Sequence, residues 1–474
     1  MPKCTIDGIE VEFEAGENLV DVAKSVGIEI PVFCYHPGLS VVAQCRMCAV
    51  DVEQMPNKLQ TACSTEAREG MVVHTQSERA LKNRESVMEF LLVNHPLDCP
   101  ICDKAGECDL QDHSYNHGNA YMRSSKERRT YLDLDMGPVI EKNMNRCIHC
   151  TRCIRLGDEV LNLREMVALQ RGNNTEISTL DGRPLETDYA GNYADVCPTG
   201  SLTLKDFRFN KRAWMLKKTR TICEGCSRGC NMEIHQDANV MHRCLPVENM
   251  EINKWWLCDE GRFHFRSLQS EKRVIDPRVG SESADWDDAL KRAKTLSEGK
   301  SVAILLGSDM TQEEAVLVLD FAKKQLNGAL VHHFGTPGVV NSSDDGDADR
   351  ILKRMSKTSN LHGMEKLGIQ GTELLPQADV YWVIRGGRAT LPDLSDSTVI
   401  GVGVFMEDEV RDYSVVLPSL GFAEKDGTVV NYSGTEQKLK RAVTPPRTCK
   451  SFSEIAMVWT HSEHVSPETQ GATL

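Results

Sequence analysis

The sequence predicts a multidomain protein in which several small α+β modules precede one α/β domain. The chain has 474 residues, which is too long for one hydrophobic core and indicates three or more domains. Fifteen of its 18 cysteines fall into four spaced sets within the first 258 residues. Beyond about residue 272, strand-like and helix-like segments alternate instead. We therefore expect small metal-binding modules in the cysteine-rich part and an α/β sheet in the C-terminal part.

Composition excludes several functional classes. The hydrophobic fraction of 40% and charged fraction of 26% are typical of a soluble globular protein, and the net charge of −14 argues against a nucleic-acid partner. The N-terminus has no apolar core of signal-peptide length, and no stretch approaches the length of a transmembrane helix, so we expect membrane contact only indirectly, through partner subunits. Many cysteines without a secretion signal indicate metal or redox use, not disulfides.

The first cysteine set follows a predicted hairpin and helix. Residues 1–15 alternate around an Asp7-Gly8 turn, and residues 17–26 have a helical apolar face. The set itself is Cys34, Cys45, Cys48 and Cys63. Its Cys-x10-Cys-x2-Cys-x14-Cys spacing keeps the Cys-x2-Cys hinge of ferredoxins and predicts a [2Fe–2S] cluster in a β-grasp domain. The alternative is a zinc site, although structural zinc sites more often pair two short knuckles.

The second set contains a histidine. It comprises His95, Cys99, Cys102 and Cys108. The three cysteines lack a fourth thiolate, and a neutral imidazole ahead of them can complete a [4Fe–4S] ligand set. A zinc site with the same three cysteines and one histidine is the alternative on spacing alone.

The third set has the Cys-x2-Cys-x2-Cys run and distant Cys-Pro of bacterial ferredoxins. It comprises Cys147, Cys150, Cys153 and Cys197. The cysteines of a second cluster are absent from residues 154–196, so we expect a ferredoxin-like module that keeps one [4Fe–4S] cluster. Arg152 and Arg155 either tune this site or dock a partner, or they are solvated arginines on a helix.

The fourth set has a different spacing, Cys-x2-Cys-x3-Cys-x27-Cys. It comprises Cys223, Cys226, Cys230 and Cys258. Gly225 and Gly229 allow the backbone to fold close to a [4Fe–4S] cluster, while zinc remains the alternative. Three cysteines belong to no set, namely Cys4, Cys244 and Cys449.

These four sets, in this order, carry a family resemblance. Residues 1–265 resemble the 75 kDa-type iron–sulfur subunit of bacterial proton-translocating NADH:quinone oxidoreductase, or complex I, through stretches such as Phe33–His36, Cys45–Cys48, His95–Asp112 and Trp256–Phe263. The resemblance implies one [2Fe–2S] and three [4Fe–4S] clusters, the second with a histidine ligand. It also implies that the main electron path runs through the first, third and second sets, with the fourth set off this path.

The resemblance further implies a place in a larger complex. The expected partners are a flavin- and NADH-binding subunit, a 2Fe-2S subunit, a two-cluster ferredoxin-like subunit and the quinone-module subunits. The expected location is the peripheral arm, on the cytoplasmic side of the inner (plasma) membrane. The chain itself would perform no substrate chemistry, although the complex is a translocating oxidoreductase.

The C-terminal part predicts a mostly parallel α/β sheet. Helices are expected over 286–296 and from the capping box of Thr311 and Glu314 to about residue 326. Strands are expected at 302–307, 329–334, 380–385 and 399–405. Val415–Pro418 and Glu424–Thr428 resemble molybdopterin oxidoreductases, but about 210 residues are too few to enclose the pterin. With no Gly-x-Gly-x-x-Gly or Walker motif, we expect a scaffold without molybdopterin, FMN or NAD.

The predicted fold class is thus multidomain α+β and α/β, with the following modules. They are a β-grasp 2Fe-2S ferredoxin-type domain (1–78), a helical 4Fe-4S module with one histidine and three cysteines (79–118), a ferredoxin-like 4Fe-4S domain (140–214), a four-cysteine 4Fe-4S module of molybdopterin-oxidoreductase type (215–271) and a truncated molybdopterin-oxidoreductase-like α/β domain (272–474). Residues 119–141 and 462–474 are expected to be a linker and a tail.

Three other functions stay open at this point. A diaphorase subunit of a NAD-reducing hydrogenase shares the first three modules but would end near residue 240. An NAD-linked molybdenum formate dehydrogenase would need a far longer catalytic domain. A zinc-stapled scaffold without redox function is the third alternative.

Overall fold

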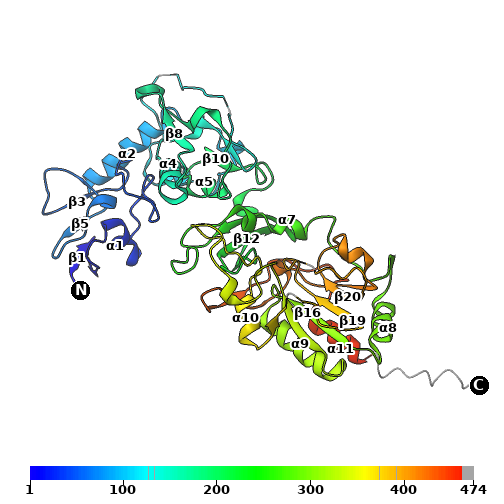
Figure 1. Ribbon diagram of the computed structural model, residues 1–474. Coiled ribbons are helices and arrows are strands. Elements are labelled where there is room, and N and C mark those ends of the chain that lie inside the picture. The colour runs from blue at the N-terminus through cyan, green and yellow to red at the C-terminus, as the bar shows by residue number, and fades with distance from the viewer. Residues whose placement is uncertain (126, 133, 373, 391, 462–474) are drawn as a thin grey trace, which may run out of the picture. The chain divides into compact units, whose positions relative to one another are not determined.

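The computed structural model describes residues 1–125, 127–132, 134–372, 374–390 and 392–461 (Figure 1). The chain forms two compact units, Met1–Leu216 and Lys217–Leu474. The tail expected at 462–474 lies outside the described residues. Within the described ranges, no helix has both the length and the apolar character needed to cross a membrane.

The first unit begins with the β-grasp domain. Its five-stranded sheet has the order β2-β1-β5-β3-β4. The elements are β1 Lys3–Ile6, β2 Ile9–Glu12, α1 Leu19–Ser25, β3 Ala49–Val52, β4 Gln60–Thr61, the 3-10 turn Ala62–Ser64 and β5 Val72–His74. The predicted hairpin is confirmed, since Asp7 and Gly8 both have positive φ between β1 and β2. Helix α1 is shorter than expected because Asn18 caps its N-terminus, accepting hydrogen bonds from Val20 N and Asp21 N.

Two helices flank the second cysteine set. They are α2 Glu78–Leu92, capped by the Ser77 side chain, and α3 Asp109–His117, with a 3-10 turn Cys99–Ile101 between them. Buried Met88 of α2 and Leu110 of α3 pack in one cluster with Phe33 and Met47 from the loop of the first set. This shared core fixes the second set against the first.

The rest of the first unit surrounds the third set. Its elements are β6 Leu134–Asp135, β7 Ile140–Lys142, the 3-10 turn Met144–Arg146, α4 Arg152–Arg155, the π-helical turn Leu156–Leu161, β8 Met166–Leu169, the 3-10 turns Gly172–Asn174 and Leu180–Gly182, β9 Glu176–Thr179, α5 Gly191–Val196, β10 Leu202–Leu204 and the 3-10 turn Ala213–Met215. The expectation of a linker through residue 141 is wrong at its end, because β6 and the start of β7 lie there and form a sheet with β10. Strands this short give no periodic signal in the sequence.

The second unit opens with an antiparallel sheet that the sequence interpretation did not include. It consists of β11 Lys217–Ile222, β12 Asn231–Asp237 and β13 Val240–Pro246, followed by the short helices α6 Asp259–Arg262 and α7 Phe265–Leu268. Ala238 and Asn239 both have positive φ and connect β12 to β13. Asparagine in a two-residue loop between alternating segments was the available hairpin signal.

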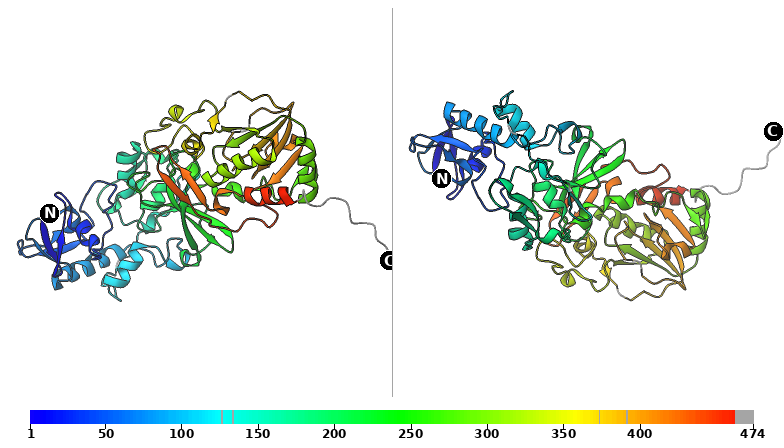
Figure 2. Two further views of the ribbon diagram at one scale, coloured as in Figure 1. Left: turned by 90° about the horizontal axis from the view of Figure 1, so that it is seen from below. Right: turned by 90° about the horizontal axis from the view of Figure 1, so that it is seen from above.

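The predicted parallel sheet is confirmed in the remaining part. Its eight strands have the order β15-β14-β21-β20-β19-β16-β17-β18, parallel from β21 to β18. Figure 2 shows this part of the chain in green to red from two further sides. The elements are β14 Arg278–Val279, β15 Glu282–Ser283, α8 Trp286–Ser297, β16 Val302–Gly307, α9 Gln312–Gln325, β17 Leu330–Phe334, the 3-10 turns Ser342–Asp344, Glu409–Asp412 and Phe422–Glu424, α10 Leu361–Lys366, β18 Gln370–Gly371, β19 Val380–Ile384, β20 Thr398–Gly403, β21 Val415–Pro418, the hairpin β22 Gly427–Val430 and β23 Glu436–Leu439, and α11 Phe452–His461.

Helices cover one face of this sheet. Ile304, Trp382 and Ile400 on that face pack in one cluster with residues of α8, α9, α10 and α11. The capping box that opens α9 is present, with Thr311 and Glu314 exchanging hydrogen bonds as the sequence predicts.

Candidate metal centres

The first set gathers in the β-grasp domain. The Cys48 and Cys63 sulfurs lie 3.4 Å apart. The thiols of Cys34 and Cys45 form a second pair, in which the hydrogen bond from Cys34 lowers the pKa of Cys45 to about 5 and raises that of Cys34. The hydrogen bond with Cys48 and burial raise the pKa of Cys63 most, and the charges of Cys48, Cys34 and Cys45 raise it further, so all four sulfurs interact. Thiolates are the form that binds metal.

A buried arginine lies beside this set. The Arg84 side chain from α2 is fully buried, and its Nη2 makes one long hydrogen bond of 3.4 Å to the carbonyl of Ala49. Its Nε and Nη1 have no hydrogen-bond partner. Burial lowers the pKa of Arg84, while the charge of Cys48 acts in the opposite sense. A buried, unpaired cation is costly, so a negatively charged cluster on the four thiolates fits this position.

The second set lines one cavity. His95, Cys99, Cys102 and Cys108 all border a space of about 560 Å³ with a largely apolar lining. Cys102 and Cys108 are buried and Cys99 is exposed. Burial lowers the pKa of His95 to about 4, and its Nδ1 is buried without a hydrogen-bond partner. A neutral imidazole with an unused nitrogen fits the role of fourth ligand.

Residues of the third set's Cys-Pro segment lie against the second set. A Cβ atom on Gly200 would come within 2.2 Å of the Cys102 sulfur. The Pro198 carbonyl accepts a hydrogen bond from the backbone N–H of Asp109 at 3.1 Å, directly after Cys108. Sequence reasoning missed Gly200, because its contact is almost a hundred residues away along the chain. Only glycine at this position leaves room for Cys102.

The third set surrounds a small internal space. Cys147, Cys150, Cys153 and Cys197 all border it, together with Thr199 and other residues. The ligand run turns sharply, because His149 and Thr151 both have positive φ. The backbone N–H of His149 donates to the Cys147 sulfur at 3.4 Å, and burial raises the pKa of Cys147 to about 11.

Arg152 and Arg155 are not solvated. Their exposed fractions are 8% and 7%, and both donate hydrogen bonds to backbone carbonyls in the ligand loops of the first and third sets. The interpretation as surface arginines on a helix is therefore wrong. Helix α4 is only four residues long, and the loop of the first set covers the face that a free helix would expose.

All four cysteines of the fourth set are buried. Burial raises the pKa of Cys230 most, and the charges of Cys223, Cys226 and Cys258 each raise it further, so the four sulfurs lie near one another. The N–H of Gly225 donates to the Cys223 sulfur at 3.3 Å, and that of Gly261 donates to the Cys258 sulfur at 3.4 Å.

Glycine again permits the close approach. A Cβ atom on Gly261 would lie 2.6 Å from the Cys223 sulfur. Sequence reasoning singled out Gly225 and Gly229 but missed Gly261, although Gly261 follows Cys258 by only three residues. Backbone N–H groups directed at sulfur are a common means of tuning an iron–sulfur site.

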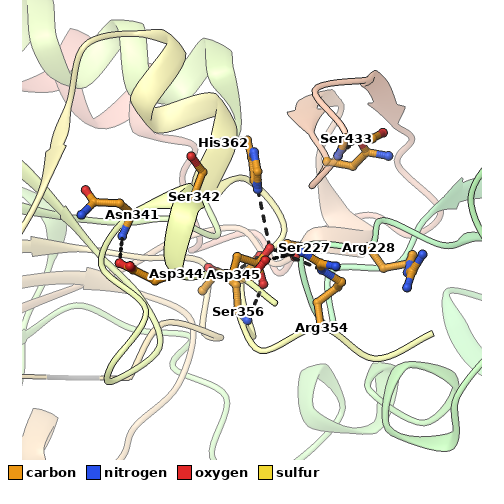
Figure 3. Close-up of polar contacts among 12 residues, drawn as sticks. Ser227, Arg228, Asn341, Ser342, Asp344, Asp345, Arg354, Ser356, His362 and Ser433 are labelled. Atoms are coloured by element: carbon orange, nitrogen blue, oxygen red, sulfur yellow. Dashed lines mark hydrogen bonds and ion pairs between the residues drawn. The ribbon is translucent and has the colours of Figure 1, made fainter. Parts of the chain in front are cut away.

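The ligand loop of the fourth set is anchored to the α/β domain of the same unit (Figure 3). The Ser227 hydroxyl donates to the buried carboxylate of Asp345 at 2.5 Å, and the N–H of Ser356 donates to the other carboxylate oxygen at 3.0 Å. Arg354 Nε and His362 Nε2 each lie 3.6 Å from Asp345 Oδ2. These partners lower the pKa of Asp345 despite its burial. The anchor holds the segment between Cys226 and Cys230 in one conformation.

The three remaining cysteines lie outside the sets. Cys4 and Cys244 are buried on strands β1 and β13, and Cys449 is buried where the Arg273 side chain donates to its sulfur. In the described residues, the four sets included, no three His, Cys, Asp or Glu side chains lie as close together as the ligands of a single metal ion do. The second and third sets instead border spaces that their ligands share.

Family comparisons match five successive segments. The 2Fe-2S iron-sulfur cluster binding domain matches residues 3–78, and the NADH-ubiquinone oxidoreductase-G iron-sulfur binding region matches 84–123. The ferredoxin-like domain of NADH-quinone oxidoreductase subunit 3 matches 137–203. The molybdopterin oxidoreductase Fe4S4 domain matches 216–270, and molybdopterin oxidoreductase matches 294–457. This order confirms the predicted fold class and 2Fe-2S and 4Fe-4S domains.

Individual relatives agree. The G subunit of NADH-quinone oxidoreductase from Rickettsia bellii is 41% identical over 61% of this chain and 43% of its own length. The mitochondrial NADH-ubiquinone oxidoreductase 78 kDa subunit of Candida albicans is 37% identical over 73% of this chain and 51% of its own length. The 75 kDa subunit of Reclinomonas americana is 34% identical over 75% of this chain and 52% of its own length.

A solved NAD+-reducing [NiFe]-hydrogenase in the H2-reduced state matches with 27% identity, over 44% of this chain and 90% of that chain. The TM-score of this match is 0.41. The chain spans about half the length of the curated relatives it matches. The resemblance predicted from the cysteine motifs is confirmed: the chain is a homologue of the G subunit of NADH-quinone oxidoreductase and of the corresponding 75 kDa subunit.

Proposed function

We propose that this chain is an iron–sulfur electron-transfer subunit in the peripheral arm of an NADH:quinone oxidoreductase. It relays single electrons from a flavin-bearing, NADH-oxidising subunit toward the quinone-reducing module. The observation that carries the proposal is the presence of four separate ligand sets on one chain, each gathered around a shared space or interacting sulfurs. Several one-electron centres on a single chain are the requirement for an electron relay.

The cofactor assignment follows the ligand sets. The first set holds one [2Fe–2S] cluster, and the second, third and fourth sets each hold a [4Fe–4S] cluster, the second through His95 and three thiolates. Bound clusters supply reversible one-electron chemistry. The protein residues hold them, exclude water and direct N–H groups at sulfur, as Gly225, Gly261 and His149 do.

The α/β domain acts in this proposal as a scaffold without molybdopterin, FMN or NAD. Its contribution is the anchor from Asp345 to Ser227 in the loop of the fourth set. Electrons then enter and leave through partner proteins, namely the flavin subunit, a 2Fe-2S subunit, the two-cluster ferredoxin-like subunit and the quinone module. The peripheral arm lies on the cytoplasmic side of the inner (plasma) membrane in this proposal, and this chain reaches the membrane only through partners.

Metal analysis of the anaerobically purified full chain tests the assignment. Full occupancy corresponds to about 14 iron per chain, because one set binds a two-iron and three sets bind four-iron clusters. Iron near that value without molybdenum is the expected result. Iron lower by about four, with about one zinc per chain, would assign one set to a structural zinc site. Molybdenum near one per chain would contradict the scaffold role of the α/β domain.

A further inference from the structure

One arginine side chain connects the ligand loops of the first and third sets. The Nη2 of Arg155 donates to the carbonyl of Cys34 at 2.6 Å and to the carbonyl of Cys150 at 3.2 Å. Its Nη1 donates to the carbonyl of Ser40, farther along the first loop. A single guanidinium therefore donates hydrogen bonds to the backbone carbonyls of one ligand residue from the first set and one from the third set.

Arg152 makes a second connection of the same kind. Its Nη2 donates to the carbonyl of Tyr35 at 2.6 Å, and its Nη1 approaches the carbonyl of Val196 at 3.4 Å. Tyr35 directly follows Cys34, and Val196 directly precedes Cys197. Arg152 Nη1 also lies 3.7 Å from the carboxylate of Asp109, next to Cys108. Arg152 therefore joins the same two loops from another side.

Further hydrogen bonds fix this junction. Glu159 accepts the backbone N–H of Ser40 at 2.8 Å and its hydroxyl at 2.5 Å, and Gln44 Nε2 donates to the carbonyl of His149 at 2.7 Å. Both ends of the first loop are thus held against the segment that carries the third set. The distance between the two sets is set by side chains of this chain alone.

Among the described residues, no carboxylate forms an ion pair with the guanidinium of Arg155. Each acceptor that the described residues offer its guanidinium is a backbone carbonyl, and Glu159 is engaged by Ser40. Arginine keeps its proton in proteins. A buried cation compensated only by carbonyl dipoles costs free energy that a nearby negative charge would offset. Thiolate-bound clusters on both sides would supply that charge.

We propose that Arg155 is the bridge that couples the first cluster to the third. It fixes their spacing, places one permanent positive charge between them and provides a hydrogen-bonded route from the Cys34 carbonyl to the Cys150 carbonyl. This inference rests on the proposed function, because it requires both clusters. With both clusters bound, the one electron that the first cluster gives up would be taken up by the third. No bond forms or breaks and no proton moves, so Arg155 is a positioning residue.

The test uses the full chain, purified anaerobically, with three variants. Arg155→Met removes the charge and the bridge. Arg155→Lys keeps the charge but replaces the planar fork with a single ammonium, which cannot reproduce its geometry. Arg164→Met, at an exposed arginine of the same module, is the matched control. The readouts are iron content, the midpoint potentials of all clusters in an EPR-monitored titration, and the magnetic interaction between the reduced first and third clusters.

We expect Arg155→Met to retain its iron while the midpoint potentials of the first and third clusters both shift downward and their magnetic interaction changes. Arg155→Lys should return the potentials toward the wild-type values but leave the interaction altered. Arg164→Met should match the wild type throughout. Unchanged potentials and interaction in an iron-replete Arg155→Met protein would overturn the proposal.

If Arg155→Met loses iron, the magnetic interaction measured in Arg155→Lys tests the proposed bridge instead. An altered magnetic interaction in Arg155→Lys supports the bridge, and a wild-type interaction contradicts it. Failure of the underlying function has a different signature, because the wild-type chain would then lack the EPR signals of the two clusters before any substitution is made.

Discussion

At the scale of single residues, glycines and arginines beside the cysteines decide whether a cluster fits. The cysteine ligands themselves could be predicted from their spacing, because tight local turns leave a sequence signature. Gly200 and Arg84 could not, since each meets its cysteine only through the tertiary fold. Gly200 matters because a Cβ atom there would lie 2.2 Å from the Cys102 sulfur, and Arg84 matters because its side chain is fully buried. No local sequence pattern encodes either feature.

Gly261→Ala should selectively impair the fourth cluster. The new methyl group would lie 2.6 Å from the Cys223 sulfur, and overpacking at such a site costs about 1–3 kcal/mol. We expect iron content to fall by about four per chain, the content of one [4Fe–4S] cluster, with the EPR signals of the other clusters retained. Gly403→Ala in β20, where neighbours lie at least 3.9 Å away, is the control. Full iron content in the Gly261 variant would refute this steric argument.

Arg84→Met should have different effects on the first set without a cluster and on the first set with a cluster bound. Without a cluster, the variant should be as stable as the wild type or more stable by about 1–3 kcal/mol, because a buried unpaired cation is removed. With the cluster, its midpoint potential should fall, since a positive charge beside Cys48 is lost. Denaturation of the metal-free chain and redox titration of the loaded chain measure the two effects. Lys82→Met, on the same helix with a side chain that is 72% exposed, should change neither.

At the scale of elements, periodicity and capping predicted the long elements of the α/β domain. Helices α8 and α9 and strand β16 lie within a residue or two of their expected bounds, because apolar periodicity and the Thr311 capping box mark them. The sheet of β11, β12 and β13 was missed. Its strands are half-buried and polar, so their composition gives no clear strand signal. These segments form strands because they pair with one another in the fold.

Buried histidines give the α/β domain a defined acid sensitivity. Burial lowers the pKa of His333, on β17, from 6.5 to about 4. The unfolded chain therefore binds a proton more readily than the folded chain between these values, so stability falls as the pH drops from about 6.5 toward 4. His333→Gln should reduce this loss by about 1–3 kcal/mol, measured by urea denaturation across that range. A pH dependence in His333→Gln equal to that of the wild type would exclude His333 as a cause.

At the scale of the whole molecule, the chain combines a unit that carries three ligand sets with a unit in which the fourth set is anchored to an α/β domain. The order of modules was predictable because each has its own cysteine spacing, and the family matches confirm that order. The junction at Arg155 was not predictable, since it depends on backbone carbonyls more than a hundred residues away in sequence. The ligands are thus encoded locally, while their coupling is a property of the fold.

The most direct test of the relay places Cys153→Ser in the assembled complex and compares two activities. Loss of one third-set ligand should abolish NADH-driven quinone reduction. It should leave unchanged the NADH-driven reduction of a water-soluble acceptor that takes electrons from the flavin subunit, because that reaction precedes this chain. Quinone reduction at the wild-type rate, in a complex shown by EPR to lack the third cluster, would contradict the central claim that electrons pass through this protein.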